Sequence, residues 1–518
     1  MVDFMNFKNL GEILSFNAKI RPNKTYIYYE KKKFTYREID ELSNKVAKVF
    51  LKFGVTKGDR VCILLENSPE FIITYFGIAK AGGVAVPLNT YLKEEEIQYI
   101  IDNAESKVLV TSSKFEDVVK NQKKLCPTLK HIFTYDHSNF ESLNMLHLAK
   151  AETDSHPNVK ITPEDLAVFI YTSGTTGHPK GAMLTHKNLL SNVSACLQVF
   201  HIDHTYKVLL ALPMFHSYTF TASVLLPTYA GCGIIVLASI MELKKKSFKK
   251  ILLFQRPNFF LGVPQIYTAL ARANIPNWFA KFLYPIKIHI SGGAPLPEDI
   301  INEFYKKYRK PIIEGYGLSE ASPVVAVNPL NKQKPYSVGP ALPGIEVKIV
   351  NDDEEELPIG EVGELIIRGP NVMKGYWKME DATALTIRNG WLFTGDLAKL
   401  DKDGYIYIVD RKKDLIIVKG INVYPREIEE YLYLYEGIDA AAVIGIPDKQ
   451  SGEVPVAFIK VKEGSRVDLN DLKDYLKKHL ANFKIPKHIY IKDDIPMTAT
   501  GKVLKRKLKE MVLAEMKF

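Results

Sequence analysis

Helical and strand-like patterns alternate through the first three-quarters of this chain. Apolar side chains recur at helical spacing in residues 36–53 and 69–81, and residues 60–65 between them form an apolar run of strand length. This alternation is typical of α/β folds, in which helices cover a mostly parallel sheet. After about residue 336 the pattern changes to short strands joined by tight turns, as at 346–350 and 364–368. The sequence therefore predicts an α/β part followed by a hairpin-rich part.

The C-terminal part of the chain has its own cycle of helices and strands. With 518 residues, the chain exceeds what one hydrophobic core usually organises, so more than one structural unit is expected. The polar sequence Arg-Lys-Lys-Asp at 411–414 precedes this new cycle. We therefore expect residues 1–411 to form an N-terminal domain and residues 412–518 to form a small C-terminal domain.

Residues 171–181, Tyr-Thr-Ser-Gly-Thr-Thr-Gly-His-Pro-Lys-Gly, combine small hydroxylated side chains with glycines and one lysine. Glycine lets the backbone approach an anion, the hydroxyls donate hydrogen bonds, and Lys180 adds a positive charge. A Walker loop places Gly-Lys-Ser/Thr at the start of a helix, but here Lys180 is followed by Gly181 and a strand-like run. The sequence predicts a phosphate-binding loop between two strands. A flexible hairpin without a ligand is the alternative.

The excess of positive charge limits the partners of the protein. The net charge of +10 suits an anionic ligand or a phospholipid surface, but scattered lysines on a solvated face are the simpler interpretation. We find no basic stripe with interleaved aromatic residues, so nucleic-acid binding is not expected. The sequence leaves a homodimer and a peripheral membrane contact open.

Cysteine usage and the longest uncharged segment favour a cytoplasmic protein without a membrane span. Cysteines 62, 126, 196 and 232 lack paired spacing and lie in apolar surroundings, which predicts reduced core thiols. Residues 208–241 contain no Asp, Glu, Lys or Arg, but prolines, glycines and hydroxyl groups divide them into short pieces. We expect a buried strand, helix and second strand there, and we see no secretory signal at the N-terminus.

Further motifs follow the phosphate loop in a characteristic order. They are Ser-Gly-Gly-Ala-Pro at 291–295, Glu-Gly-Tyr-Gly-Leu-Ser-Glu at 314–320, Thr-Gly-Asp at 394–396, Arg411, and Pro-Met-Thr-Ala-Thr-Gly-Lys at 496–502. Together with the loop, they resemble the adenylate-forming superfamily of acyl-CoA synthetases, luciferases and peptide-synthetase adenylation domains, over nearly the whole chain. The resemblance implies an N-terminal domain of two α/β-type sheet subdomains plus a distorted β-barrel, with a small mobile α+β C-terminal domain.

The resemblance also implies a reaction in two steps. A carboxylate attacks the α-phosphorus of ATP to give acyl-AMP and pyrophosphate, and the thiol of CoA then gives acyl-CoA and AMP. Mg²⁺ is the implied cofactor, and ATP, CoA and a carboxylic acid are the implied small-molecule partners. The residues that the resemblance assigns to ATP or AMP binding are Thr172, Ser173, Gly174, Thr175, Thr176, Gly177, Lys180, Gly293, Ala294, Pro295, Glu314, Gly315, Tyr316, Gly317, Ser319, Asp396, Ile408, Arg411 and Lys502.

Five of the side chains have individual roles in this scheme. Glu320 is an anionic oxygen ligand suited to Mg²⁺, and the resemblance places the hydroxyl of Thr172 beside the same ion. Tyr316 offers a flat face for adenine, and this stacking tolerates a phenol that points to solvent. Asp396 can accept both ribose hydroxyls. Lys502 is implied as the catalytic lysine that contacts the carboxylate and the α-phosphate. Each of four side chains also has a structural explanation when it is taken singly. Glu320 fits a carboxylate at a helix N-terminus and Tyr316 a core tyrosine. Asp396 fits a turn residue and Lys502 a solvated lysine.

Rotation of the C-terminal domain is implied between the two steps. Lys413 is the expected hinge, because it lies at the domain boundary where family members carry Asp or Lys. The rotation would withdraw Lys502 and bring Lys419, Gly420 and Ile421 to the site. Gly420 would then let the pantetheine thiol pass close to the backbone.

Residues 212–220, Leu-Pro-Met-Phe-His-Ser-Tyr-Thr-Phe, resemble the acyl-gate motif of fatty-acid and aryl CoA ligases. The resemblance makes His216 a movable catalytic wall between the acyl site and the CoA tunnel, although a lone histidine is more often structural. Amino-acid adenylation domains place an aspartate shortly after this motif. Because residues 211–241 contain no acidic residue, an amino-acid substrate is not expected.

Glycines at the expected acyl pocket favour a long substrate. Acetate-specific members carry tryptophan where Gly317 stands. We therefore expect Gly317, Gly292 and Gly293 to leave room for a longer tail that Phe220 and Val263 line. A medium- or long-chain fatty acid is the predicted substrate. The alternatives are an aryl acid of the coumarate type, transfer to a carrier protein, and, from another class, a non-catalytic lipid-binding scaffold.

Overall fold

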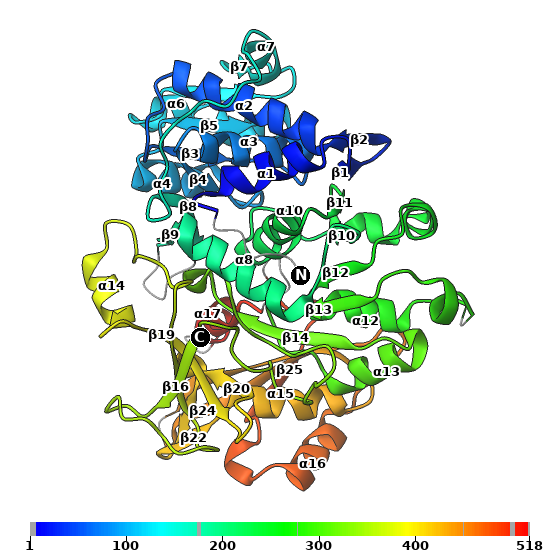
Figure 1. Ribbon diagram of the computed structural model, residues 1–518. Coiled ribbons are helices and arrows are strands. Elements are labelled where there is room, and N and C mark those ends of the chain that lie inside the picture. Colours follow the sequence, from blue (N-terminus) through cyan, green and yellow to red (C-terminus); the bar gives the residue numbers. More distant parts are fainter. Residues whose placement is uncertain (1–6, 173–177, 277, 449, 498–502, 516–518) are drawn as a thin grey trace.

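The computed structural model describes residues 7–172, 178–276, 278–448, 450–497 and 503–515. Figure 1 shows two α/β units, one above the other, with an antiparallel sheet and the C-terminal domain below them. This mixed α/β architecture, with a large N-terminal part and a small C-terminal part, is the predicted fold class.

The first α/β unit is built on a seven-stranded sheet with the strand order β7-β6-β5-β3-β4-β8-β9. Its strands are β3 (Arg60–Ile63), β4 (Val84–Pro87), β5 (Val108–Thr111), β6 (His131–Thr134), β7 (Leu143–Asn144), β8 (Leu166–Thr172) and β9 (Lys180–Thr185). Neighbouring strands are parallel except for β8 and β9, which form an antiparallel pair. The predicted phosphate loop therefore connects two strands, as expected, and not a strand and a helix.

The second α/β unit is an eight-stranded sheet with the order β15-β14-β13-β12-β10-β11-β1-β2. Its strands are β1 (Thr25–Tyr29), β2 (Lys32–Thr35), β10 (Lys207–Leu210), β11 (Gly233–Val236), β12 (Phe259–Gly262), β13 (Ile288–Ser291), β14 (Ile312–Gly317) and β15 (Val324–Val327). The strands from β1 to β14 in this order are parallel. Their carboxyl ends therefore meet at one edge of the sheet, where α/β folds place their ligands.

Helix α3 (Pro69–Lys80) joins the cores of the two units. All of its residues except Glu70 are buried, and the rings of Phe71 and Tyr75 pack on Phe220 of α9 (Ser217–Phe220) in the second unit. Its last residue, Lys80, is fully buried, and the ammonium donates to Asp40 Oδ1 at 2.6 Å and to two further side chains. These hydrogen bonds compensate the cost of burying the charge.

The predicted helices begin where capping residues satisfy free backbone amides. Thr35 and Glu38 form a capping box at the start of α2 (Tyr36–Lys52), and Thr185 accepts from Asn188 N at the start of α8 (His186–Phe200). The uncharged segment 208–241 forms β10, a continuous helical run from α9 through η2 (Thr221–Leu225) to α10 (Leu226–Ala230), and β11. This confirms the predicted strand, helix and strand. None of the helices in the described ranges is long and apolar enough to cross a bilayer.

The hairpin-rich part forms a five-stranded antiparallel sheet where the resemblance implies a distorted barrel. Its strands are β16 (Glu346–Val350), β17 (Gly363–Arg368), β18 (Ile387–Arg388), β19 (Trp391–Leu400) and β20 (Ile406–Arg411). An isolated bridge joins Pro340, in the segment before β16, to Tyr405, the residue directly before β20. All four cysteines of the chain are free and buried, which confirms the predicted core thiols.

The C-terminal domain packs helices on both faces of a second five-stranded sheet. Its strands are β21 (Ile416–Val418), β22 (Ile421–Val423), β23 (Ile438–Asp448), β24 (Gly452–Val461) and β25 (His488–Ile491). Helices α15 (Pro425–Leu434) and α16 (Leu469–His479) share one apolar cluster, and α17 (Lys505–Glu515) contributes to another. The domain thus has cores of its own, as an independent unit requires.

Candidate functional site

The strands flanking the phosphate loop bring its two ends together. Thr172 ends β8 and pairs with Lys180, which begins β9. The intervening predicted residues, Ser173, Gly174, Thr175, Thr176 and Gly177, lie outside the described ranges, as does Lys502.

Helix α4 (Glu94–Ala104) holds both ends of the loop. Tyr99 stacks on His178 with 4.8 Å between ring centroids, and its hydroxyl donates to Pro179 O at 3.1 Å. The hydroxyl of Tyr171 donates to Asn103 Oδ1 at 2.6 Å. Sequence reasoning missed Tyr99 and Asn103, because they lie about 70 residues before the loop and belong to an ordinary amphipathic helix. They are positioning residues, since they act on the strands and not on a ligand.

A carboxylate and a hydroxyl meet at the end of β8. Thr172 Oγ1 donates to Glu320 Oε1 at 3.4 Å, and the hydroxyl of Tyr376 donates to the same oxygen at 2.9 Å. Within the described part of the chain, Glu320 takes part in no ion pair, and Oε2 has no hydrogen bond. Carboxylate and hydroxyl oxygens are ligands that Mg²⁺ prefers, so Thr172 and Glu320 fit the implied metal. Tyr376, whose ring lies 5.3 Å from Lys180 Nζ, was not expected here.

Tyr316, Asp396 and Arg411 form the second cluster of the site. The register of β19 and β20 places Asp396 opposite Arg411, and Asp396 Oδ1 lies 3.5 Å from Arg411 Nε. Tyr316 on β14 donates its hydroxyl to Asp396 Oδ2 at 2.5 Å. The phenol does not point to solvent here, because the buried carboxylate of Asp396 is its acceptor. Burial, and next the charge of Asp396, raise the pKa of Tyr316 well above 10, so the phenol stays protonated and donates.

Glu314 lies on the same strand as Tyr316, next to the C-terminal domain. Burial raises the pKa of Glu314 to about 7, and the charge of Arg426 on α15 opposes this rise. The backbone amide of Leu296, which follows Ala294 and Pro295 on the loop after β13, donates to Glu314 Oε1 at 3.4 Å. Arg426 also donates to the carbonyl of Ile408 at 2.6 Å. Two predicted nucleotide-binding positions are thus in reach of one arginine of the other domain.

The glycines of the predicted acyl pocket have another explanation. A Cβ at Gly317 would lie 2.1 Å from Pro323 O, and a Cβ at Gly292 would lie 2.8 Å from the Tyr218 ring. The protein therefore fills the position that a Cβ would take at both residues, so internal packing explains these glycines and they are no sign of room for a tail. Gly293, in contrast, has φ +85, and a Cβ there would have only Val263 Cγ1 within 4.0 Å, so the space beside its backbone is open.

The expected acyl-gate segment forms the start of a buried helix. His216 is partly buried and precedes α9, where its carbonyl accepts from Phe220 N at 2.9 Å. Ser217 Oγ lies 3.0 Å from Ser319 Oγ, so the gate segment touches the Glu314–Glu320 motif. Phe220, at the end of α9, and Val263, directly after β12, are buried apolar residues. The hydroxyl of Tyr218 is buried and has no partner among the described residues.

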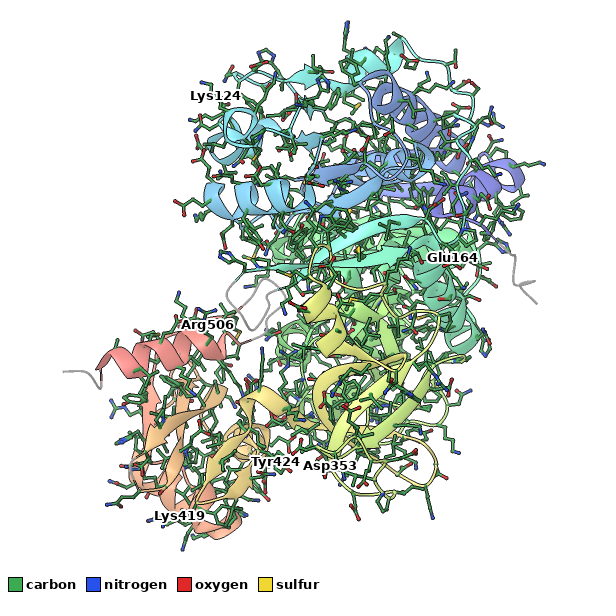
Figure 2. All side chains as sticks on the ribbon, turned by 90° about the vertical axis from the view of Figure 1, so that its left-hand side faces the viewer. Lys124, Glu164, Asp353, Lys419, Tyr424 and Arg506 are labelled. Carbon is green, nitrogen blue, oxygen red and sulfur yellow. The ribbon has the colours of Figure 1, made fainter. Side chains whose placement is uncertain are left out.

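The residues expected to meet CoA lie far from the site. Lys419 and Gly420 form the turn between β21 and β22, with φ +51 and +79, and Ile421 begins β22. Figure 2 shows Lys419 at the outer end of the C-terminal domain and Arg506 at the opposite end. Lys413 is exposed within the short helix η7 (Lys412–Asp414) that connects the domains.

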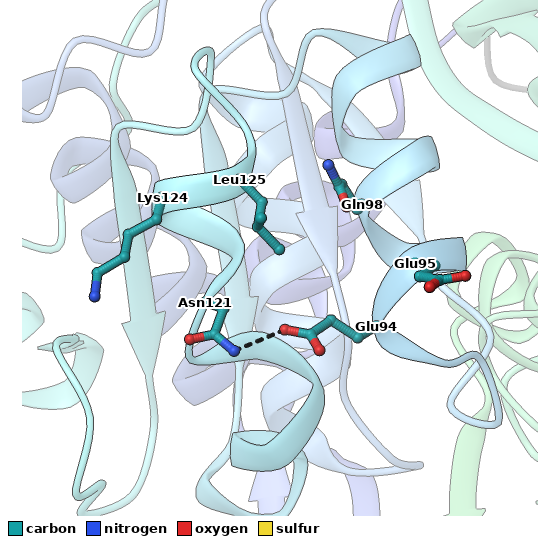
Figure 3. A pocket seen from close by; sticks show the side chains of 6 residues that line it. All are labelled: Glu94, Glu95, Gln98, Asn121, Lys124 and Leu125. Carbon is teal, nitrogen blue, oxygen red and sulfur yellow. Dashed lines mark hydrogen bonds between the residues drawn. The ribbon is translucent and has the colours of Figure 1, made fainter.

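One surface hollow is unrelated to these clusters. Its volume is about 410 Å³, and Figure 3 shows it between α4 and α6 (Gln122–Leu125), with Asn121 donating to Glu94. The residues that line it are Glu94, Glu95, Gln98, Asn121, Lys124 and Leu125. None of the predicted site residues is among them, and its two carboxylates do not suit an anionic nucleotide.

Comparisons with known proteins agree with the geometry. Residues 14–377 match the AMP-binding enzyme family, and residues 427–502 match the AMP-binding enzyme C-terminal domain. A long-chain-fatty-acid–CoA ligase of Bacillus subtilis (strain 168) is 37% identical, with 97% of this chain and 94% of that protein covered. A feruloyl-CoA synthase of Amycolatopsis sp. is 34% identical, with 97% and 98% covered.

Solved structures give the same result. The crystal structure of ATP-bound MatB from Rhodopseudomonas palustris has a TM-score of 0.89 at 32% identity, with 98% of this chain and 99% of that chain covered. An anthranilate CoA ligase in complex with anthranoyl-AMP has a TM-score of 0.91 at 26% identity, with 98% of each chain covered. The similar proteins thus include both aliphatic and aromatic acids in their names.

Proposed function

The chain belongs to the AMP-binding enzyme family and is an adenylate-forming acyl-CoA ligase, and from this premise we propose that its acid is a medium- or long-chain fatty acid. The observation that carries the proposal is that residues 211–241, which contain the gate segment, offer no Asp, Glu, Lys or Arg to a substrate. Phe220 in this segment and Val263 directly after β12 are buried apolar residues. Burying apolar tail surface contributes about 0.8 kcal/mol per methylene, which favours long chains.

In the first step, the two clusters hold ATP for attack by the carboxylate. The phosphates lie at the loop between Thr172 and Lys180, and Asp396 accepts the ribose hydroxyls while Tyr316 and Arg411 orient it. Bound Mg²⁺ would neutralise charge on the phosphates, and Thr172 and Glu320 are the residues that would hold it. Lys502 would add positive charge where the phosphorus becomes five-coordinate in the transition state.

In the second step, the C-terminal domain rotates about Lys413 and presents residues 419–421 to the site. The observed orientation fits the first step, because Met497 Sδ, shortly before Lys502, lies 3.8 Å from Gln265 of the N-terminal domain. Gly420 has φ +79 and open space around it, so a pantetheine thiol could pass its backbone after the rotation. The thiol then displaces AMP from the acyl group.

A hydroxylated aryl acid is the second candidate, and one side chain favours it. The buried hydroxyl of Tyr218 needs a partner, and a phenol or methoxy group of the substrate would supply one. The ring of Tyr218 lies against Gly292, at the expected acyl site. The feruloyl-CoA synthase similarity supports the same candidate.

The experiment measures AMP release with ATP, Mg²⁺ and CoA across straight-chain acids from acetate to stearate, and with coumarate, ferulate and benzoate. The expected result is a maximum at aliphatic acids of about eight carbons or more. Tyr218→Phe should leave that maximum in place. If ferulate or coumarate is preferred, and Tyr218→Phe lowers kcat/KM for it by tenfold or more, the aryl acid is the substrate.

We further propose that the enzyme works in the cytoplasm. Its four thiols are free, and burial raises the pKa of Cys62, Cys196 and Cys232 to about 12, so they stay protonated and unreactive. Free thiols are typical of proteins in a reducing compartment such as the cytoplasm.

A further inference from the structure

Most of the surplus positive charge lies in one stretch that has no acidic residue. Between Glu242 and Glu298 the chain holds seven lysines and two arginines, but no aspartate or glutamate. The protein as a whole has a net charge of +10, so the rest of the chain is almost neutral. The nine basic residues are Lys244, Lys245, Lys246, Lys249, Lys250, Arg256, Arg272, Lys281 and Lys287. The charge is therefore concentrated along the chain, and the interpretation as scattered lysines is incomplete.

The same stretch exposes large apolar side chains to solvent. Phe254 and Phe282 are 80% and 81% exposed, and Trp278 is 60% exposed. Leu253 and Leu283, next to the two phenylalanines, are exposed as well. Single exposed apolar residues are common, but a group of them marks an interaction site.

Sheet topology brings these residues to one edge. Phe254 lies on η4 (Ile251–Gln255), which enters β12, and Phe282 lies on η5 (Phe279–Leu283), which enters β13. The strands β12 and β13 are adjacent and parallel, with Phe259 paired to Ile288. Each segment is anchored by a buried residue, Leu252 or Ala280, while its aromatic side chain remains outside. Figure 1 shows both connections toward the right-hand side of the molecule.

Basic side chains surround the exposed rings. Arg256 and Lys287 are exposed directly before β12 and β13, and Lys287 N donates to Asn258 O at 3.0 Å, which ties the two connections together. Lys249, Lys250 and Lys281 are exposed on the same segments. Within the described part of the chain, these five basic residues take part in no ion pair. We call this surface the basic-aromatic edge; it comprises Lys249, Lys250, Leu253, Phe254, Arg256, Trp278, Lys281, Phe282, Leu283 and Lys287.

We propose that the basic-aromatic edge docks on the surface of an anionic phospholipid membrane. Aromatic rings and leucines enter the headgroup region, while lysine and arginine remain beside the lipid phosphates. The absence of acidic side chains from this stretch suits an anionic surface and not a neutral one. Charge complementarity therefore selects the lipid as the occupant.

Docking at this edge leaves the catalytic site accessible. The proposed nucleotide-binding residues follow β13 or lie in the carboxyl half of β14, whereas the basic-aromatic edge lies at the amino ends of β12 and β13. Strands of four residues are only about 13 Å long, so the two edges are close. The delivery of a membrane-borne fatty acid to the site rests on the proposed function, but the docking itself does not.

The test uses sedimentation of the full-length protein with phosphatidylcholine vesicles, with and without phosphatidylglycerol. We expect binding to the anionic vesicles only, and a decline with added salt. The double change Phe254→Ser with Phe282→Ser should weaken binding about tenfold or more. Lys249→Glu with Lys250→Glu should weaken it roughly fivefold or more for each charge.

The matched control is the double change Ile359→Ser with Leu385→Ser. Both residues are about as exposed as the edge phenylalanines, at 68% and 75%, but lie outside the basic stretch. The control should bind vesicles like the original protein. Equal binding to both kinds of vesicle, or equal binding of the Phe254/Phe282 variant, would overturn the proposal. A dimer that only the Phe254/Phe282 variant loses, without vesicle binding by either protein, would assign the edge to a second copy of the chain.

Activity measurements separate this proposal from the proposed function. Pyrophosphate exchange with octanoate, in the absence of vesicles, should be the same for the Phe254/Phe282 variant and the original protein, which also shows that the variant is folded. Vesicle binding without activity toward any fatty acid would refute the proposed substrate and leave the docking intact. Activity toward fatty acids without vesicle binding would refute the docking and leave the proposed substrate intact.

Discussion

Replacing Tyr316 with phenylalanine tests the link between the adenine and ribose positions. The phenol donates to Asp396 Oδ2 at 2.5 Å, while Arg411 Nε lies 3.5 Å from the other carboxylate oxygen. Phenylalanine keeps the flat face but removes the donor. Asp396 is only 8% exposed, so water replaces the lost hydrogen bond poorly.

The size of the effect follows from the type of hydrogen bond. A hydrogen bond to a charged acceptor contributes about 1.5–3 kcal/mol, which corresponds to roughly 10- to 150-fold in binding. Arg411 still contacts Asp396 in the variant, so we expect the lower end of this range. Tyr316→Phe should therefore raise the KM for ATP about tenfold, with a smaller change in kcat, because the hydrogen bond is present before and during the reaction.

The assay is pyrophosphate exchange at varied ATP concentration, combined with Asp396→Asn in a double-mutant cycle. The two changes should be coupled, because each removes the same hydrogen bond. Tyr305→Phe, at an exposed tyrosine of α13 (Glu298–Tyr308), is the control and should leave the KM unchanged. A KM for Tyr316→Phe within twofold of the original value, or strictly additive effects in the cycle, would refute the role of the phenol in orienting Asp396.

Two further predictions concern stability and domain orientation. Burial lowers the pKa of His289 to about 3, so only the unfolded chain gains this proton as the pH falls below the unfolded pKa of about 6.5. In urea unfolding, this group should make the free energy of unfolding about 2 kcal/mol smaller at pH 5 than at pH 7. His289→Phe should remove that part of the pH dependence. Arg426→Ala removes the contact between the C-terminal domain and Ile408 O. Pyrophosphate exchange should therefore fall several-fold more than thioester formation from supplied acyl-AMP. Equal losses in the two assays would contradict the assignment of this domain orientation to the first step.

The α/β pattern was predictable because it depends on local periodicity. The helices predicted at 36–53 and 69–81 are found as Tyr36–Lys52 and Pro69–Lys80, with boundaries set by capping residues that the sequence displays. The uncharged segment 208–241 was also readable, since Pro213 lies before its helical run and Gly231 ends that run, although Pro227 lies inside it. Apolar periodicity and the positions of proline and glycine are local signals that act within a few residues, so a single sequence is enough to predict these elements.

The supporting residues of the site were not predictable for the opposite reason. Tyr99, Asn103 and Tyr376 reach the phosphate loop or Glu320 from elements far away in the chain. Nothing in their own neighbourhood distinguishes them from ordinary helix and loop residues. Their role depends on which strands become neighbours, and this is a property of the whole sheet.

Glycine shows most clearly why the acyl pocket was misjudged. In a sequence, a glycine that makes room for a ligand cannot be told apart from a glycine that lets two parts of the protein approach each other. At Gly317 the neighbour is the backbone of Pro323, and at Gly292 it is the ring of Tyr218, so both glycines serve internal packing. Any argument about acid size must therefore start from movable side chains. Tyr218 is the first of these, because its ring is beside Gly292 and its hydroxyl lacks a partner among the described residues.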